Sequence, residues 1–285
     1  MTLYFKNGKY TQKDEVTVSI DDRGYYFGDG VYEVIKVYGG SLYTAEEHFT
    51  RFLSSAEKIR MPLPYTVAEF TEIAERLAED NGITEGHVYI QATRGVAPRI
   101  HNFPGEETEP MITGYAIENP RPLAKLESGV AVKTVDDIRW LRCDIKSLNL
   151  LANVMAKQEA VEADCAEAVF IRDGIVTEGS SSNIFGVKDG ILYTHPATNL
   201  ILNGITRRVV LKCCAQESIG VMEETFSLDE LRAMDEVFLT STTSEITPIT
   251  SIDGEQVGDG KPGPLTARLQ AVFESTIGQV QQKTN

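Results

Sequence analysis

The stretches DIRWLRCDIKSLNLL (137–151) and VTEGSSSNIFGVKDGILYTHP (176–196) decide how this sequence is interpreted. The first places Lys146 between an expected aromatic and basic strand and an expected amphipathic helix. The second places Glu178 at the start of a Gly/Ser-rich turn. A lysine amine can form a Schiff base with an aldehyde, and a carboxylate can keep a pyridine nitrogen protonated. The pair therefore predicts the protein's half of pyridoxal 5′-phosphate chemistry.

Taken alone, each residue also has an ordinary explanation, Lys146 as a surface lysine and Glu178 as a turn residue. The neighbouring residues favour the functional interpretation. Trp140 and Leu148 would partly bury the lysine amine, which favours its nucleophilic form. The segment GSSSN (179–183) offers small residues that let a planar ring approach the backbone, and hydroxyls that donate hydrogen bonds.

Two further segments contain candidate phosphate donors. NGITRR (203–208) can begin a helix at a glycine, so that the amides of Ile205 and Thr206 point outward from the first turn, and Thr206 adds a hydroxyl. The polar run at 241–244, which contains Ser241 and Thr242, is a second donor cluster, and Arg51 is a candidate charge partner. For each of them singly, a plain helix cap or solvated turn is the simpler explanation. The hypothesis is that all of them converge on one phosphate.

The loop RGVAPRIHNFPGEE (94–107) contains a candidate site for a substrate carboxylate. Arg99 and His101 are two positions apart, so in an extended chain both side chains project to the same side. An arginine fork beside a histidine suits a carboxylate, although a basic surface loop is an equally good explanation. For Tyr32, the pattern allows a core position as readily as a substrate contact.

Composition limits the classes of function. The chain has 285 residues and a net charge of −15, which argues against nucleic acid or an anionic membrane as partner. Its four cysteines show no metal-ligand or disulfide spacing, so we expect reduced thiols, no metal site and a cytoplasmic location. There is no long apolar run, and the first residues do not resemble a signal peptide.

Local patterns predict two domains. Asn7-Gly8, Asp173-Gly174 and Asp189-Gly190 are typical of tight hairpin turns. Thr44 with Glu47, and Thr66 with Glu69, are expected to form capping boxes at helix starts, and a further helix is expected over 147–165. The segment 118–127 breaks the pattern with two prolines, so we expect a linker there. It separates a domain of residues 1–120 from one of residues 121–285.

At these motifs the chain resembles the class IV pyridoxal-phosphate aminotransferases, and within them the subgroup that acts on D-amino acids. The run from EGSSSN through LYTHP to ILNGITR is the most specific part of the likeness. The matching segments are DDRGYYFGDGVYEVIKVYGG, EHFTRFLSSAEKIR, TRGVAPRIHNFP, DIRWLRCDIKSLNLL, VTEGSSSNIFGVKDGILYTHPATNLILNGITR and TSTTSEITP. They span residues 21 to 248, whereas the chain beyond about residue 250 matches weakly.

The resemblance implies an α+β fold with a small α/β domain, a larger pseudobarrel domain, and pyridoxal 5′-phosphate bound between them in a homodimer. It implies that Lys146 forms the Schiff base and that Glu178 holds the pyridine nitrogen. It implies that the phosphate is bound by Arg51, Ile205, Thr206 and Thr242, with Leu202 against the ring and Ser181 and Ser241 nearby. It also implies that Tyr32, Arg99 and His101 bind the substrate carboxylate, the last two from the partner subunit.

The activity that follows from the resemblance is transamination of D-amino acids, such as D-alanine with 2-oxoglutarate, by a ping-pong mechanism. Three alternatives stay open at this point. Within the class, the chain is compatible with a branched-chain L-amino acid aminotransferase or an aminodeoxychorismate-type lyase. Outside it, a cofactor-free binding protein that kept the fold would show no visible absorption band.

Overall fold

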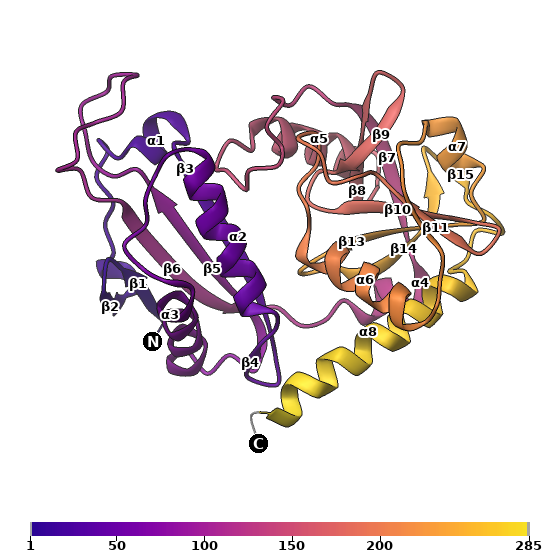
Figure 1. The fold of residues 1–285 in the computed structure, drawn as a ribbon, viewed down its shortest axis with the longest axis horizontal. Coiled ribbons are helices and arrows are strands. Elements are labelled where there is room, and N and C mark those ends of the chain that lie inside the picture. The colour runs from indigo at the N-terminus through magenta and orange to yellow at the C-terminus, as the bar shows by residue number, and fades with distance from the viewer. Residues whose placement is uncertain (1, 284–285) are drawn as a thin grey trace. The chain divides into compact units, whose positions relative to one another are not determined.

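The computed structural model describes residues 2–283 of the chain, which forms two compact units (Figure 1). Unit 1 contains the residues up to Pro120, the short segment Ile145–Asn149 and the chain from Gln279. Unit 2 contains Arg121–Asp144 and Leu150–Gly278. The segment with Lys146 thus belongs to unit 1, whereas a single boundary after residue 120 would assign it to the second domain.

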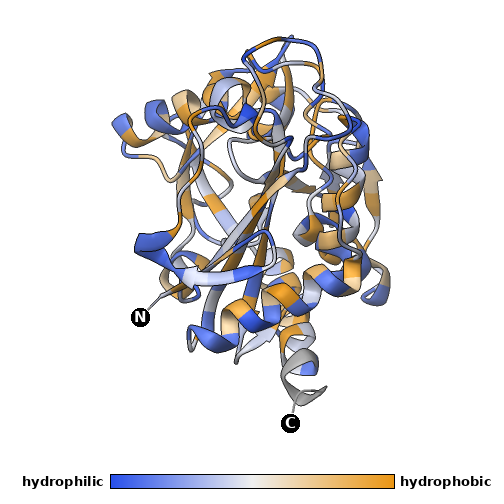
Figure 2. Ribbon diagram, turned by 90° about the vertical axis from the view of Figure 1, so that its left-hand side faces the viewer, coloured by the Kyte–Doolittle hydropathy of each residue, from blue (hydrophilic) through white to orange (hydrophobic). Residues whose placement is uncertain are grey.

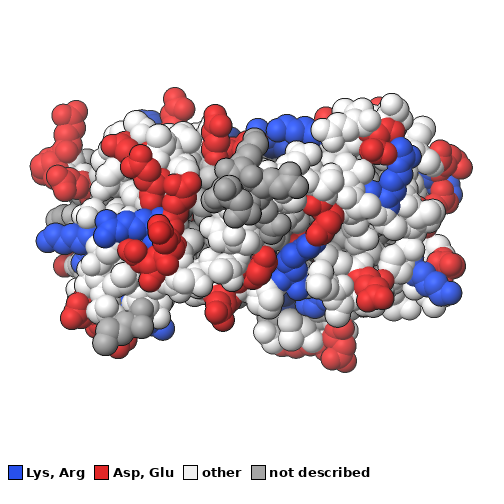
Figure 3. Space-filling model, turned by 90° about the horizontal axis from the view of Figure 1, so that it is seen from below, with Lys and Arg blue, Asp and Glu red and all other residues white. Residues whose placement is uncertain are grey.

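Hydropathy and charge are distributed as expected for a folded acidic chain. Several strands carry long hydrophobic stretches, whereas the helices carry both hydrophilic and hydrophobic residues (Figure 2). Acidic side chains are spread over the face shown in Figure 3, in keeping with the net charge of −15. Within residues 2–283, no helix is both long and apolar enough to span a membrane.

Unit 1 is a six-stranded antiparallel sheet in the order β2-β1-β6-β5-β3-β4. Its strands are β1 (Leu3–Lys6), β2 (Lys9–Gln12), β3 (Gly30–Tyr38), β4 (Ser41–Leu42), β5 (Glu85–Thr93) and β6 (Met111–Glu118). Its helices are η1 (Lys13–Glu15), α1 (Arg23–Phe27), α2 (Ala45–Lys58) and α3 (Val67–Asp80).

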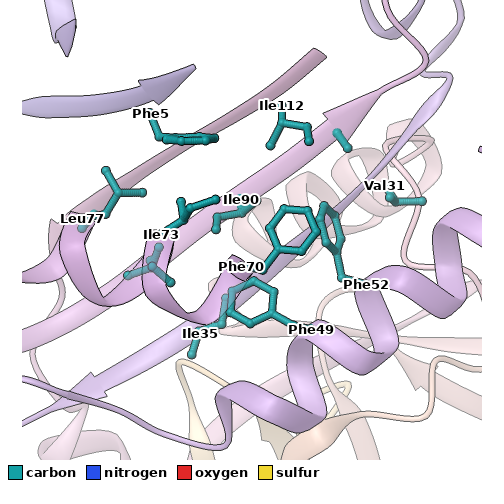
Figure 4. Packing of buried hydrophobic residues seen from close by; sticks show 14 of the residues in the cluster. Phe5, Val31, Ile35, Phe49, Phe52, Phe70, Ile73, Leu77, Ile90 and Ile112 are labelled. Carbon is teal, nitrogen blue, oxygen red and sulfur yellow. The ribbon is translucent and has the colours of Figure 1, made fainter. Parts of the chain in front are cut away.

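Helices α2 and α3 cover one face of this sheet through an aromatic core. Phe49 and Phe52 of α2 meet Phe70 of α3, with ring centroids 5.6 and 5.1 Å apart, and all three are fully buried. They lie against sheet residues such as Ile35 and Ile90 (Figure 4). Because side chains alternate along a strand, β3 turns every second residue away from this core.

The three predicted turns and one of the two capping boxes are confirmed. Asn7 and Gly8 have φ of 39° and 81°, and the Asp-Gly pairs show the same left-handed geometry, which a type I′ turn requires. Thr66 and Glu69 form the expected capping box. The box at Thr44 is wrong: Thr44 is itself left-handed, and its hydroxyl donates to the carbonyl of Tyr43, so it does not cap α2.

Unit 2 contains a nine-stranded mixed sheet in the order β12-β11-β10-β13-β14-β7-β8-β9, with β15 beside β14. Its strands are β7 (Val130–Asp136), β8 (Glu167–Arg172), β9 (Ile175–Gly179), β10 (Asn183–Lys188), β11 (Ile191–Thr194), β12 (Val221–Glu223), β13 (Glu236–Ser241), β14 (Glu245–Ile252) and β15 (Glu255–Gln256). Its helices are α4 (Leu123–Ser128), α5 (Leu151–Glu162), α6 (Ile205–Gln216), α7 (Leu228–Arg232) and α8 (Pro264–Lys283).

The sheet of unit 2 must curl. β9 ends the strand order and β10 lies near its other end, yet only the three serines 180–182 connect them. The Gly179 amide also donates to the carbonyl of Ser182 across this connection, at 2.7 Å. The two distant strands are therefore brought together, and Val132, Val169 and Ile184 lie in the apolar core of the curled sheet.

Helix α5 is shorter than the predicted helix over 147–165, because it begins only at Leu151. Residues before it make hydrogen bonds to β3 instead of forming a first helical turn. Its packing also differs from the amphipathic expectation. Only Ala156 and Ala160 are buried, whereas Leu151 and Val154 are 75% and 61% exposed.

Candidate active site

The Lys146 segment pairs with β3 as a short extra strand. β4 pairs with β3 only at Val37 and Tyr38, so the first half of that edge is open. There the Tyr32 amide donates to the Lys146 carbonyl at 3.0 Å, and the Leu148 amide donates to the Gly30 carbonyl at 3.0 Å. Gly30 is required at this position, because a Cβ would lie 2.4 Å from the Ala92 carbonyl oxygen. The backbone of the segment is thus held by unit 1.

The Lys146 side chain lies over an aromatic ring. Its Nζ is 4.1 Å from the ring centroid of Tyr32, and its backbone amide donates to Ser55 Oγ at 3.2 Å. Tyr32 is half-buried and stacks on Tyr89, with centroids 5.6 Å apart. Its neighbours Val31 and Glu33 point into the buried side of β3, so Tyr32 belongs to the opposite face. Two residues predicted for separate roles, Lys146 and Tyr32, therefore lie together in unit 1.

Behind β3 lies a buried charged cluster that the sequence interpretation missed. Glu33 is fully buried and accepts hydrogen bonds from Arg51 Nε at 2.6 Å, Arg51 Nη2 at 2.9 Å and His48 Nδ1 at 2.7 Å. Burial opposes ionisation of Glu33, but the charge of Arg51 and the hydrogen bonds from Arg51 and His48 outweigh it and hold the pKa of that carboxyl far below its usual value. The sequence did contain a signal for this cluster. A glutamate lies in an apolar strand, and a histidine and an arginine lie one turn apart on α2.

This cluster fixes the position of Arg51, which was predicted to bind the phosphate. The Arg51 side chain is only 12% exposed, and two of its guanidinium nitrogens donate to Glu33. The fork is therefore held in one orientation by a buried carboxylate, which is a form of preorganisation. His48, by contrast, has a pKa lowered by burial, although Glu33 opposes this shift.

In unit 2, Glu178 lies at the end of β9 and is buried. Its Oε1 accepts from Arg139 Nη1 at 2.5 Å, and its Oε2 accepts from the Leu202 amide at 3.0 Å and Asn183 Nδ2 at 3.3 Å. Burial raises the pKa of Glu178 to about 7, since Arg139 and the Leu202 amide only partly compensate for lost solvation. A further positive charge beside this carboxyl would therefore favour its ionised form.

Arg139 was not predicted from the sequence, although it is the one residue that forms an ion pair with Glu178 among those described. Asp137 accepts from Arg139 Nε and Nη2, both at 2.9 Å, and also pairs with Arg172 at 3.0 Å. Burial opposes ionisation of Asp137, but the Arg139 hydrogen bond and charge lower its pKa overall. Asp137 and Arg139 are two residues apart in the DIRW motif, a spacing that suggested a strand rather than a support for Glu178.

A second buried carboxylate organises the serine turn after Glu178. Glu167 accepts from the hydroxyls of Ser180, of Ser181 at 2.8 Å and of Ser182 at 3.3 Å. It is 5% exposed, whereas Ser181 lies at the surface of the turn. The turn that contains the predicted Ser181 is therefore held in place by β8.

The predicted phosphate donors of unit 2 lie around Asn183, the first residue of β10. Asn183 donates to the Leu202 carbonyl at 2.9 Å and pairs in register with Thr240 of β13. A Cβ at Gly204 would lie 2.2 Å from Asn183 Oδ1, so the start of α6 lies against the same residue. Near Asn183 the structure thus brings Glu178, Leu202 and the first residues of α6, Ile205 and Thr206, together with the strand end that leads into Ser241 and Thr242.

The start of α6 is suited to an anion. Gly204 supplies no capping side chain, so the first amides of this 12-residue helix are not capped by their own N-cap. The turn after β13 has a similar character: Ser241 Oγ accepts from the Ser244 amide at 3.0 Å, and Thr242 is half-buried in the turn.

Arg99 and His101 lie in the exposed loop between β5 and β6. Both face the ring of Phe27: the Arg99 Cζ is 5.3 Å from its centroid and the His101 ring is 5.6 Å away. The two side chains predicted to act together are therefore on the same side of the loop.

Comparison with known proteins identifies the family. The description Amino-transferase class IV matches residues 30–252, a span that contains Lys146, Glu178 and both phosphate segments. The chain belongs to the class IV aminotransferases. The predicted family and the α+β class IV fold are thereby confirmed.

Individual relatives show which members of the family this chain resembles in sequence and in fold. D-alanine aminotransferase of Staphylococcus haemolyticus is 52% identical over 277 residues, which is 97% of this chain and 98% of that protein. D-alanine aminotransferase of Bacillus licheniformis is 48% identical over 278 residues, 98% of each chain. A solved branched-chain amino acid aminotransferase from Thermobaculum terrenum, in its PLP-form, has a TM-score of 0.85 at 26% identity, over 97% of this chain and 94% of that one.

Proposed function

We propose that the chain catalyses transamination of D-amino acids, taking D-alanine and 2-oxoglutarate to pyruvate and D-glutamate, with pyridoxal 5′-phosphate as cofactor. The observation that carries this proposal is the 52% identity to a D-alanine aminotransferase along nearly the full chain. The sequence identity to the solved branched-chain enzyme is only 26%. This lower identity disfavours the L-amino acid alternative. A cytoplasmic location, inferred from the cysteines, and the absence of a metal stay parts of this proposal.

The donor sets fit this cofactor. The buried Glu178, whose pKa is raised to about 7, would be stabilised as a carboxylate by the positive charge of a protonated ring nitrogen. The uncapped start of α6 offers the amides of Ile205 and Thr206 to a phosphate. Residues predicted to complete the cofactor contacts are Arg51, Ser181, Leu202, Ser241 and Thr242, with Lys146 as the covalent partner.

When bound, the cofactor supplies an aldehyde that links to an amine and a ring that withdraws electrons from the substrate α-carbon. Lys146 Nζ would act as the base that takes the α-proton and as the acid that later gives a proton back. Glu178 would keep a positive charge on the ring nitrogen. Arg139 holds Glu178 in place, since its own guanidinium is fixed by Asp137.

Substrate handedness would depend on where the carboxylate is bound. If Tyr32, Arg99 and His101 bind the carboxylate, the bound substrate has only one orientation in which its α-hydrogen faces Lys146. That orientation admits one enantiomer. Arg99 and His101 would serve the partner's site across a dimer interface.

A homodimer is supported by exposed apolar side chains in unit 2. Ile138, Leu141 and Leu151 are 67%, 59% and 75% exposed, although they are large and apolar. Burial of these side chains against a second copy would remove apolar surface from water, and a second copy is the partner that the class implies.

The proposal is tested by assaying D- and L-amino acids separately with 2-oxoglutarate as acceptor. We expect turnover of D-alanine with formation of D-glutamate, and little turnover of L-leucine. Activity on L-leucine alone would establish the branched-chain alternative, and pyruvate release without an acceptor would establish a lyase.

Replacing Arg99 by leucine should raise the KM for D-alanine by at least about tenfold, since each charge-assisted hydrogen bond of a bidentate fork contributes on the order of 1.5–3 kcal/mol. The D-over-L ratio should fall as well, while the visible absorption of the bound cofactor is unchanged. Steady-state kinetics with both alanine enantiomers measures the two effects.

Subunit mixing provides the control for this prediction. Heterodimers of Arg99→Leu and Lys146→Ala chains would contain one site with Lys146 from one chain and Arg99 from its partner. Activity should partly return on mixing. Demonstrated heterodimers without recovery, together with an unchanged KM in the single variant, would contradict the carboxylate assignment.

A further inference from the structure

The loop with Arg99 and His101 is fastened to unit 1 by one buried arginine. Arg23, the first residue of α1, is only 3% exposed. Its Nη1 donates to the carbonyl oxygen of Ile100 at 2.7 Å and to that of Asn102 at 3.3 Å. These two carbonyls flank His101, so a single guanidinium nitrogen holds the backbone on both sides of a residue predicted to contact substrate.

The Arg23 side chain is itself held in its orientation by the carboxylate of Asp29. Its Nε donates to Asp29 Oδ2 at 2.8 Å, and Arg94 donates to both Asp29 oxygens, at 2.9 and 3.0 Å. Arg94 in turn donates to the carbonyls of Ile59 and Arg60, at 2.8 and 3.0 Å, at the end of α2. The anchor of the loop is therefore connected to the helical layer of the unit rather than to the surface.

The same short helix also supplies an aromatic contact for both predicted trap side chains. The ring of Phe27 lies 5.3 Å from Arg99 Cζ, 5.6 Å from the His101 ring and 4.9 Å from Arg23 Cζ. A guanidinium over an aromatic face is attracted electrostatically, and the planar contact restricts its rotation. Phe27 thus limits the orientations of two otherwise exposed side chains.

We propose that Arg23 and Phe27 are positioning residues that set the carboxylate specificity of this enzyme, Arg23 through the loop backbone and Phe27 through the side chains of Arg99 and His101. This rests on the proposed role of Arg99 and His101 in substrate binding. Neither residue needs to touch substrate. Their effect is preorganisation, because a fork that is already oriented loses less conformational freedom on binding.

The first test is Arg23→Lys. Lysine keeps a positive charge beside Asp29, but a single ammonium cannot reproduce the fork that reaches Asp29 and both loop carbonyls. We expect the KM for D-alanine to rise about tenfold and the D-over-L ratio to fall, with a smaller change in kcat, because misplacing a binding group by about 1 Å has effects of this order or larger. Arg76→Lys, at a surface arginine paired with Asp80 in the same unit, is the matched control.

Two readouts do not depend on turnover. Amide hydrogen exchange of peptides from 96–110 should be faster in Arg23→Lys than in the control, and binding of propionate, a carboxylate without the reacting amine, should weaken by a similar factor. The absorption of the bound cofactor should be unchanged. Loop exchange and propionate affinity equal to those of the wild type would overturn the positioning role.

If Arg23→Lys folds poorly, variants of Phe27 still test the proposed positioning of Arg99 and His101. Phe27→Leu removes the aromatic face and should raise the KM, whereas Phe27→Tyr keeps the face and should restore it. A KM that depends only on side-chain volume, not on aromaticity, would contradict the role assigned to Phe27.

A double-mutant cycle separates this inference from the proposed function. If Arg23 acts through Arg99, then Arg23→Lys should have little further effect on the KM in an Arg99→Leu background. Arg99→Leu without effect on the KM would refute the proposed carboxylate site itself. An effect of Arg99→Leu but none of Arg23→Lys would leave that site intact and refute only the positioning role.

Discussion

Replacing Lys146 by alanine is expected to abolish transamination, lowering kcat by about 10³-fold or more through loss of the general base and of the covalent link. The fold should be unaffected, because the segment is held on β3 through the backbone groups of Lys146 and Leu148 rather than through the lysine side chain. Activity toward D-alanine and thermal unfolding measure the two effects.

Chemical labelling tests the same assignment in the wild-type enzyme. Borohydride should bleach the visible absorption and fix the cofactor covalently to Lys146, which peptide mapping would identify. Lys9→Ala, at an exposed lysine of unit 1, is the control and should keep full activity. A label on another lysine, or turnover by Lys146→Ala near that of the wild type, would show that the central assignment is wrong.

Glu178→Gln should keep the cofactor bound but slow proton removal from D-alanine by about a hundredfold or more, the size of effect found when a preorganised electrostatic contact is lost. An amide cannot stabilise the protonated ring nitrogen by charge. Rapid mixing of enzyme with D-alanine, without an acceptor, isolates this step. Half-reaction rates equal to those of the wild type would mean that another group controls the ring nitrogen.

The same variant has a pH signature in the cofactor-free protein. The pKa of Glu178 is raised from 4.5 to about 7 in the folded state, so the folded form binds a proton more tightly than the unfolded form. This contribution to stability is present below pH 4.5 and is lost as pH rises through 7. It amounts to about 3 kcal/mol, since each unit of pKa corresponds to about 1.4 kcal/mol.

Glutamine does not titrate, so Glu178→Gln should gain stability relative to the wild type between pH 4.5 and 7 and then stay level. Urea unfolding of the cofactor-free proteins across this range measures the difference. Glu255→Gln, at a carboxyl that is 72% exposed, should show no comparable trend. A difference between wild type and Glu178→Gln that does not vary with pH would contradict the burial argument.

Features that depend on neighbouring residues could be predicted from the sequence. The Asn-Gly and Asp-Gly pairs specify left-handed turns because few other residues adopt positive φ without strain. Thr66 and Glu69 form a capping box within one helical turn. Thr44 has the same local pattern but failed as a cap, because the turn from β4 forces it into a left-handed conformation.

For the candidate site too, features that depend on neighbouring residues were predicted, whereas contacts between distant segments were not. The roles of Lys146 and Glu178 were predicted from their motifs, because a specific run of neighbours accompanies each. The residues that pair with the candidate site were not predicted. Arg139, which pairs with Glu178, was interpreted as part of a strand, and Glu33, which pairs with Arg51, did not stand out within an apolar strand. These charges are meaningful only beside partners from other elements.

The sequence by itself determined the turns and the family motifs, and it predicted which residues do the chemistry, since all of these depend on residue type and short spacing. Only the tertiary structure decided that Lys146 pairs with β3, that Glu178 faces Arg139, and that Arg23 holds the loop around His101. The physical reason is that burial and ion pairing depend on contacts between distant segments, and the energy of a charge is set by what surrounds it after folding.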